Sequence, residues 1–441
     1  MKRTSLMILT AAVLSALAGA AHAETAPPST DELLRRIDLL AGEVEALKLG
    51  EVAARADQTQ YGLGPAASKV YRAKQGVSIG GYGEIQYYDF AASKDSGGSS
   101  GKSDQSNLQR LVMYLGYKFS DRVIFNSEIE FEYAASSGNR EGQGGAWGVE
   151  FAYLDFLLRP EVNVRAGNLL IPMGFVNELH EPTIFLGVRR PDIERVILPT
   201  TWRENGVGVF GDLGSITYRS YLVTSFDAGS CRKDGNGCSN DGFTSSGIRD
   251  GRQNGSRSVA EDWAWVTRVD YSPQVGSTIG GAVYLGDSGQ DQTKESTPDV
   301  PTRIAELHAE VRRSGVEFRA LGAMTWIGNV AQLNAARLPA LTGSDSVGSR
   351  QYGFYGQLGY QLASLGLDVM LTPFVRYEQW NTQARVPAGY SANPANFQKS
   401  LTTGVQYKPV DQVVVTADYQ NFSNGAGTAI DQFNLGLGFI F

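Results

Sequence analysis

The sequence predicts an all-β chain: a transmembrane antiparallel β-barrel of about 16 strands, preceded by a short N-terminal periplasmic coiled-coil helix. Three observations predict this architecture. The last eleven residues alternate between large apolar and small or polar side chains, amphipathic segments of similar length recur from residue 76 onward, and the chain begins with a secretory signal.

The C-terminal segment, residues 431–441, is the strongest of these signals. Phe433, Leu435, Leu437, Phe439 and Phe441 occupy every second position and therefore share one face of an extended strand. A strand that ends a soluble protein would leave this face and its edge uncovered. In a closed barrel in lipid the edge is paired and acyl chains solvate the face.

Residues 1–23 have the form of a cleaved signal peptide. Lys2 and Arg3 precede an apolar run over 6–17, and Ala-His-Ala at 21–23 is a small-x-small cleavage site. The apolar run is too short for a helical membrane span. The signal peptide and the predicted strands together indicate export to the outer membrane of a Gram-negative bacterium. There the barrel would contact lipid and lipopolysaccharide.

Residues 24–75 are expected to hold a periplasmic coiled-coil segment and a linker. Leu33, Leu40 and Leu47 repeat at one heptad position, and Ile37 and Val44 at the complementary one. So short a helix is marginal alone but stable if several copies meet, which predicts a homotrimer. The alternative is an amphipathic helix that lies against its own barrel or on peptidoglycan. Residues 55–75 are interpreted as a polar linker.

Sixteen strands are predicted over residues 76–441. They are expected near 77–90, 107–119, 122–134, 147–158, 161–168, 203–213, 215–226, 262–271, 275–287, 302–313, 315–327, 350–362, 366–380, 398–408, 411–422 and 431–441. Short connections alternate with long ones rich in Gly, Ser, Asn and Asp. A barrel with both termini in the periplasm predicts this alternation, with tight turns at that end and long loops outside.

Charged residues fall on one parity within the strands. In 302–313, for example, Glu306, His308 and Glu310 oppose Leu307 and Ala309. Charge facing lipid is costly, so the charged parity is expected to face the lumen. Sixteen strands enclose more space than side chains fill, which leaves an aqueous interior.

The two cysteines, Cys231 and Cys238, are separated by six residues in a polar connection of an exported chain. This spacing favours a small-loop disulfide on a solvated surface loop. A metal site is the weaker interpretation, because two Cys without a nearby His do not complete a tetrahedral shell. We expect neither a metal nor a cofactor.

The third long connection, residues 169–205, is rich in Leu, Ile, Phe and Val and should therefore fold inward onto the barrel wall. There it would form a constriction, where charges set ion preference. The side chains expected to contact solute are Glu178, His180, Glu181, Arg189, Arg190, Arg195 and Arg203. Alternatively, each of these charged side chains belongs to a structural salt bridge that fixes the loop. Lumen-wall arginines are expected at Arg110, Arg165, Arg219 and Arg376.

Within this connection the chain resembles the phosphate-selective porin O and P family. The resemblance rests on Pro-Met-Gly-Phe-Val-Asn-Glu at 172–178, Arg-Pro at 190–191, Thr-Trp-Arg-Glu-Asn-Gly-Val-Gly at 201–208, and Gly-Tyr-Gly-Glu at 81–84. It covers residues 76–441. The resemblance implies a trimeric sixteen-stranded channel of the outer membrane. In some members of that family, inward-facing Arg and Lys bind phosphate.

One feature departs from that family. Basic residues of inward parity do not outnumber acidic ones. Six arginines (Arg110, Arg165, Arg219, Arg268, Arg319 and Arg376) stand against nine glutamates, at Glu84, Glu128, Glu130, Glu132, Glu150, Glu306, Glu310, Glu317 and Glu378. This mixture also suits the transverse field of a general porin. The sequence therefore predicts a channel for small hydrophilic solutes and ions, with anions such as phosphate as a candidate class.

Other functions fit the sequence less well. The alternative is a structural barrel tethered to the cell wall or to partner proteins through its N-terminal stalk. Catalysis is not expected, because outside the signal only His180 and His308 could act as a general base and no nucleophile elbow accompanies them. A net charge of −7 argues against nucleic acid as a partner.

Overall fold

The structure is a computed structural model that describes residues 59–133, 145–229, 242–290, 299–337, 340–366 and 369–441. The predicted signal peptide, the coiled-coil helix and the disulfide between Cys231 and Cys238 lie outside the described residues. The barrel belongs to a compact unit that runs from Ala54 to Phe441.

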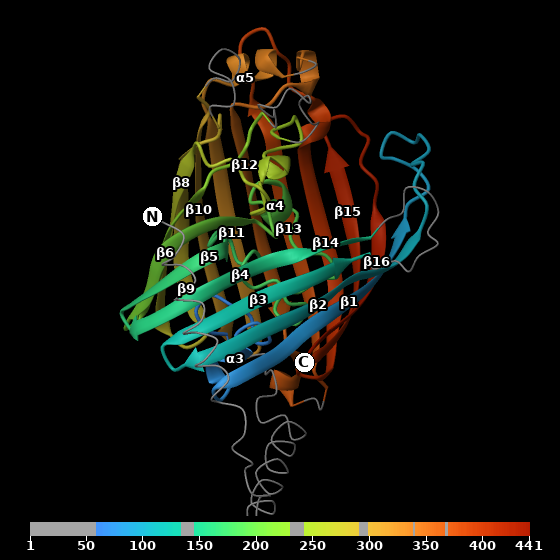
Figure 1. Cartoon of the computed structure of the whole chain (residues 1–441). Coiled ribbons are helices and arrows are strands. Elements are labelled where there is room, and N and C mark those ends of the chain that lie inside the picture. The colour runs from blue at the N-terminus through green and yellow to red at the C-terminus, as the bar shows by residue number, and fades with distance from the viewer. Residues whose placement is uncertain (1–58, 134–144, 230–241, 291–298, 338–339, 367–368) are drawn as a thin grey trace, which may run out of the picture. The chain divides into compact units, whose positions relative to one another are not determined.

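Within the described residues, sixteen antiparallel strands close into one barrel, each paired with its neighbours in sequence (Figure 1). This confirms the predicted fold class. The strands are β1 (Gly76–Phe90), β2 (Gln105–Ser120), β3 (Val123–Glu132), β4 (Ala146–Arg159), β5 (Val162–Leu170), β6 (Arg203–Leu213), β7 (Ile216–Thr224), β8 (Trp263–Gln274), β9 (Ser277–Asp287), β10 (Pro301–Arg313), β11 (Val316–Ile327), β12 (Arg350–Tyr360), β13 (Leu371–Arg385), β14 (Phe397–Val410), β15 (Val413–Asn424) and β16 (Gln432–Ile440).

The seam that closes the barrel joins β1 to β16. Gly83 lies opposite Phe439, and the Phe439 ring covers the place where a Cβ of Gly83 would stand, 2.5 Å from its Cζ. Phe441 covers Gly81 in the same way. The C-terminal aromatic residues therefore lie across small residues of the first strand and cover the outer side of the seam.

Connections alternate in length around the barrel. Two residues join β2 to β3, whereas 38 residues join β7 to β8 (225–262). We call the two ends of the barrel the turn end, where the short connections and the C-terminus lie, and the loop end, where the long connections lie. This arrangement agrees with the predicted alternation.

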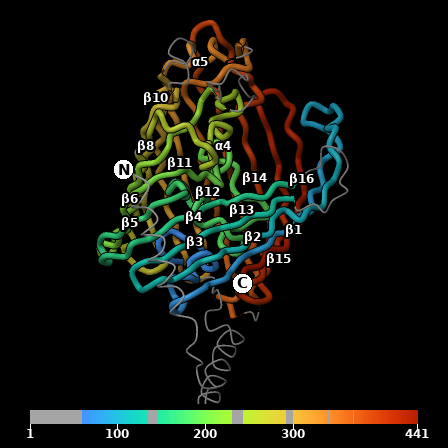
Figure 2. The backbone as a smooth tube through the Cα atoms, in the orientation of Figure 1, coloured from blue at the N-terminus to red at the C-terminus, as the bar shows by residue number. Residues whose placement is uncertain are grey.

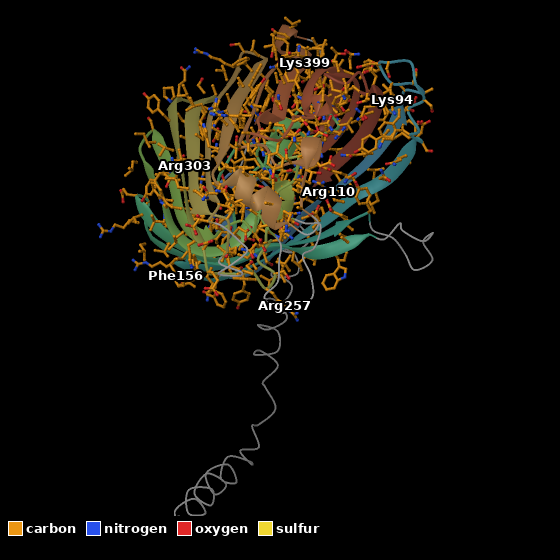
Figure 3. All side chains as sticks on the ribbon, turned by 90° about the horizontal axis from the view of Figure 1, so that it is seen from above. Lys94, Arg110, Phe156, Arg257, Arg303 and Lys399 are labelled. Atoms are coloured by element: carbon orange, nitrogen blue, oxygen red, sulfur yellow. The ribbon has the colours of Figure 1, made fainter. Side chains whose placement is uncertain are left out.

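The two faces of each strand differ as the parity predicts. In β2 the apolar side chains of Leu111, Met113 and Leu115 are exposed on the outer wall, whereas Arg110 and Tyr114, on the alternate positions, are buried inside. Figure 3 shows Phe156 on the outer side of the wall and Arg110 within the barrel. An apolar outer band and a polar interior are what a membrane barrel requires.

Helices are few and short in the described residues. They are α3 (Lys69–Arg72), α4 (Ile193–Val196), α5 (Val330–Ala336), and the 3-10 turns η1 (Arg249–Gly251), η2 (Gly343–Asp345), η3 (Leu362–Leu365) and η4 (Pro394–Asn396). None of the described helices is both long enough and apolar enough to cross a bilayer.

Residues 59–75 differ from the polar linker that the sequence predicts for this part of the chain. Leu63, Ala66, Ala67 and Val70 are at most 3% exposed, and they pack against the inner wall near the turn end. Their burial depends on residues far along the chain, which local composition does not reveal.

Candidate functional site in the barrel interior

The connection between β5 and β6, residues 171–202, folds into the space that the strands enclose; Figure 2 traces it around the label α4. The Asn177 side chain ties the two ends of the connection together. Its Nδ2 donates to the Ile171 carbonyl at 2.7 Å and the Trp202 carbonyl at 2.9 Å, and its Oδ1 accepts from Trp202 N at 2.8 Å. We call residues 171–202 the inserted loop.

The middle of the inserted loop reaches strands on several sides of the barrel. Its backbone carbonyls accept hydrogen bonds from long polar side chains of the wall, because no regular ladder satisfies them there. These bonds are Lys408 to Thr183 (2.9 Å), Arg312 to Ile184 (3.0 Å), Gln406 to Phe185 (3.0 Å), Arg376 to Leu186 (3.0 Å) and Gln86 to Val188 (3.1 Å). The loop thus spans the lumen from β10 around to β1.

Glycines on the inner wall make room for the apolar side chains of the inserted loop. These inward-facing positions are Gly353 and Gly359 on β12 and Gly436 and Gly438 on β16. A Cβ at Gly353 would lie 2.6 Å from Ile193 Cδ1, and one at Gly438 would lie 2.5 Å from Pro182 Cβ. Such distances are too short for real contacts, so side chains at these positions would displace the loop. We call the four positions the glycine trough.

Three of the predicted solute contacts are buried and hold the loop in place. Glu178 lies 3.4 Å from the Arg219 guanidinium, and Glu181 accepts from the backbone N–H of Ala66 and of Ala67. Burial raises the pKa of Glu181 to about 7, although these two N–H groups lower it in part.

His180 is the third of these buried residues. Its Nδ1 contacts the Asn177 carbonyl at 2.9 Å, and its Nε2 lies 3.0 Å from the Glu128 carboxylate. Burial lowers the pKa of His180, but Glu128 outweighs that effect and leaves it raised. Both ring nitrogens are thus engaged. His308 lies between Glu306 and Asp270 in a similar way.

The predicted arginines of the connection divide into two groups. Arg189 and Arg195 both face Asp192, at 3.4 and 2.8 Å, and Arg190 donates to the His180 carbonyl at 3.1 Å. Burial raises the pKa of Asp192, but the two guanidinium groups outweigh it and lower the pKa below its usual value. Arg203, in contrast, belongs to β6 and pairs with Glu150 at 2.7 Å.

The four predicted wall arginines are paired with acidic side chains. The pairs are Arg110 with Glu130 (3.3 Å), Arg165 with Asp155 (2.8 Å), Arg219 with Asp270 (2.8 Å) and Arg376 with Glu378 (2.9 Å). Among these arginines, Arg110 alone also lines the cavity described next. The other three hold the interior together.

An open cavity of about 750 Å³ lies above the inserted loop, toward the loop end. Phe185, Val188 and Trp380 contribute apolar parts of its wall. In the described part of the chain, its charged lining consists of the basic Lys102, Arg110, Arg189, Arg190, Arg195 and Arg249 and the acidic Glu84, Glu132 and Asp192. We call this cavity the vestibule. Basic groups outnumber acidic ones there by six to three.

Two basic residues of the vestibule are not recognisable from the sequence. Lys102 belongs to the β1–β2 connection and Arg249 to η1 in the β7–β8 connection, and neither stands in a motif. Arg249 donates to the Thr200 carbonyl at 2.9 Å, which places it beside the inserted loop. Burial and the neighbouring Arg252 and Arg195 lower the pKa of Arg249.

Arg376 is expected to contribute strongly to the stability of this arrangement, because it anchors the loop at Leu186 and pairs with Glu378 while fully buried. Arg376→Met should lower the free energy of unfolding by about 3 kcal/mol, since a buried carboxylate loses its partner. Denaturant unfolding in detergent measures this. Arg376→Met/Glu378→Gln should recover part of the loss, and Arg303→Met on the outer wall serves as the control. A fully stable Arg376→Met protein would contradict this role.

Comparisons with known proteins agree with the barrel. No protein-family model matches the chain. An uncharacterized protein of Aquifex aeolicus (strain VF5) is 36% identical over 377 residues, which cover 85% of this chain and 82% of that protein. Salmonella typhi OmpF, solved in complex with daunomycin, matches with a TM-score of 0.53 at 13% identity over 83% of this chain and 97% of its own. An anion-selective porin from Comamonas acidovorans has a TM-score of 0.49 at 11% identity, covering 83% and 100%.

Proposed function

We propose that this chain, which belongs to the same family as the uncharacterized Aquifex aeolicus protein, forms a water-filled channel for passive diffusion of small hydrophilic solutes and ions through the bacterial outer membrane. The fold that it shares with OmpF supports the proposal. The observation that carries it is the vestibule of about 750 Å³, open toward the loop end and floored by a loop that folds inside the barrel.

We propose further that the channel favours anions. The wall pairs, such as Arg165 with Asp155 and Arg376 with Glu378, neutralise one another, so the excess of basic groups in the vestibule sets the local field. Arg110 Nη1 and Arg190 Nε are also buried donors with no hydrogen-bond partner in the described part of the chain. Donors of this kind suit an anion with several acceptor oxygens. Because the loop resembles that of the phosphate-selective porin O and P family, phosphate is the candidate anion.

Assembly and location follow from the same proposal. The heptad pattern of 31–54 favours a homotrimer with its stalk in the periplasm, within reach of peptidoglycan. The signal over 1–23 favours export, and the apolar outer wall suits outer-membrane lipid and lipopolysaccharide.

Purified protein in a planar lipid bilayer tests the proposal directly. We expect discrete conductance steps, and in a KCl gradient a reversal potential of the sign that chloride permeation gives. Cation preference would end the anion proposal and leave the channel intact. A folded protein that passes no ions in bilayers and no sugars in liposome swelling would instead support the structural barrel tethered through its stalk.

A further inference from the structure

A second segment occupies the lumen below the inserted loop. Residues 60–73, which we call the plug segment, lie inside the barrel at the turn end, where α3 is labelled in Figure 1. Inner-wall glycines approach it closely: a Cβ at Gly116 would lie 2.6 Å from Val70 Cγ2, and one at Gly80 would lie 3.0 Å from the Ala66 carbonyl. The wall is thus shaped to receive this segment.

Polar side chains of the strands hold the plug segment against the wall. Asn126 on β3 donates to the Ala67 carbonyl at 2.8 Å. The Tyr71 hydroxyl donates to Asp155 on β4 at 2.6 Å and accepts from Arg165 on β5 at 3.2 Å. Hydrogen bonds to three strands therefore fix the segment in the interior of the barrel.

The inserted loop covers the other side of the plug segment. The Glu181 carboxylate accepts from Ala66 N at 3.0 Å and from Ala67 N at 2.9 Å. A Cβ at Gly62 would lie 2.6 Å from Glu178 Oε1, so the loop also touches the beginning of the segment. The plug segment is thus enclosed between the wall of β1–β7 and the loop, and its position depends on both.

Basic side chains of the plug segment and the neighbouring wall lie at this level of the lumen. Lys69 and Arg72 belong to α3, and Lys118 on β2 donates to the Tyr71 carbonyl at 3.4 Å and lies 3.0 Å from Asp121. Lys69 is only partly buried. Its side chain is therefore available to solvent at the turn end, where a solute would leave the lumen.

We infer that the plug segment forms a second constriction, in series with the inserted loop, and that Lys69 is a selectivity-determining residue within it. The inference rests on the proposed channel function. Two narrow levels in series both limit current, so a change at either one alters conductance. In this inference a solute that passes the vestibule leaves the lumen beside the plug segment, where it meets Lys69.

Cysteine modification tests this inference in the full-length protein. We expect Lys69→Cys, after reaction with an anionic methanethiosulfonate, to lose at least half of its conductance and to shift its reversal potential toward cations. A cationic reagent should reverse the shift in selectivity. Lys94→Cys, in the β1–β2 connection at the outer rim (Figure 3), is the matched control and should show neither effect. The parent protein, treated identically, reports any reaction at Cys231 and Cys238.

A second variant loosens the contacts of the plug segment and leaves the net charge of residues 60–73 unchanged. Tyr71→Phe/Glu181→Gln removes the hydroxyl contact with Asp155 and weakens the carboxylate contact with Ala66 and Ala67. We expect higher conductance from a barrel that still shows heat-modifiable mobility on gels. Unchanged conductance and reversal potential in both this variant and fully modified Lys69→Cys would overturn the inference. A wild-type protein without conductance would instead refute the channel itself.

Discussion

Replacing residues 183–199 by a short Gly-Ser linker should raise single-channel conductance severalfold and admit larger sugars in liposome swelling. These residues carry the part of the inserted loop that reaches β10, β13 and β14 on the far wall. Removing them widens the lumen above the plug segment, which stays in place at the turn end. The clamp formed by Asn177 lies outside the deleted stretch and should keep the loop ends together.

The control for the deletion is removal of residues 95–98, an exposed tip of the β1–β2 connection. This change shortens the chain at the loop end and removes no residue that lines the vestibule. We expect its conductance to equal that of the wild type. If the loop deletion folds into a heat-modifiable barrel but keeps the wild-type conductance and size limit, the inserted loop does not limit the pore.

Neutralising Lys102, Arg190 and Arg195 together with Gln should move the reversal potential in a KCl gradient toward zero. The change leaves three basic and three acidic groups in the vestibule and preserves the contact between Arg189 and Asp192. The shift should be larger at low salt, because screening is weaker there. Single-channel recordings at two salt concentrations measure both effects.

Two further variants test whether the position of the charge, and not net charge alone, sets the reversal potential. Glu132→Gln removes one acidic group from the vestibule and should shift the reversal potential further toward anions. Arg303→Gln removes the same charge as each Arg→Gln change, but from the outer side of β10 (Figure 3), and should leave selectivity unchanged. Equal shifts in the outer-wall and vestibule variants would show that net charge, and not the vestibule, sets selectivity.

The barrel itself was predictable because every strand repeats the same physical constraint. Exposed Leu307 and buried His308 on β10 follow the parity read from the sequence, and the C-terminal strand closes the seam with its aromatic face outward. Strand ends agree with their predictions to within three residues except in β13, which is predicted over 366–380 and runs five residues later, from Leu371 to Arg385. Lipid on one side and water on the other fix these features locally, so distant contacts are not needed to infer them.

The interior could be predicted only in part. Only small residues, Pro and Lys separate Leu63 from Val70, so the plug segment resembles a linker until the wall glycines that receive it are known. Glu178 and Glu181 are charged residues in an apolar loop, but their partners, Arg219 and the backbone of the plug segment, lie far away in sequence. Local patterns do not separate a buried tie of this kind from a solute contact.

The glycine trough has a consequence for biogenesis. Half of it belongs to β16, the last strand in sequence. Val188, in the middle of the inserted loop, is also bonded to Asp418 on β15 and Gln86 on β1. The loop therefore cannot settle into its final position until the first and last strands have met. A newly inserted barrel should pass through a leakier stage, and sealing should be the final event of its maturation.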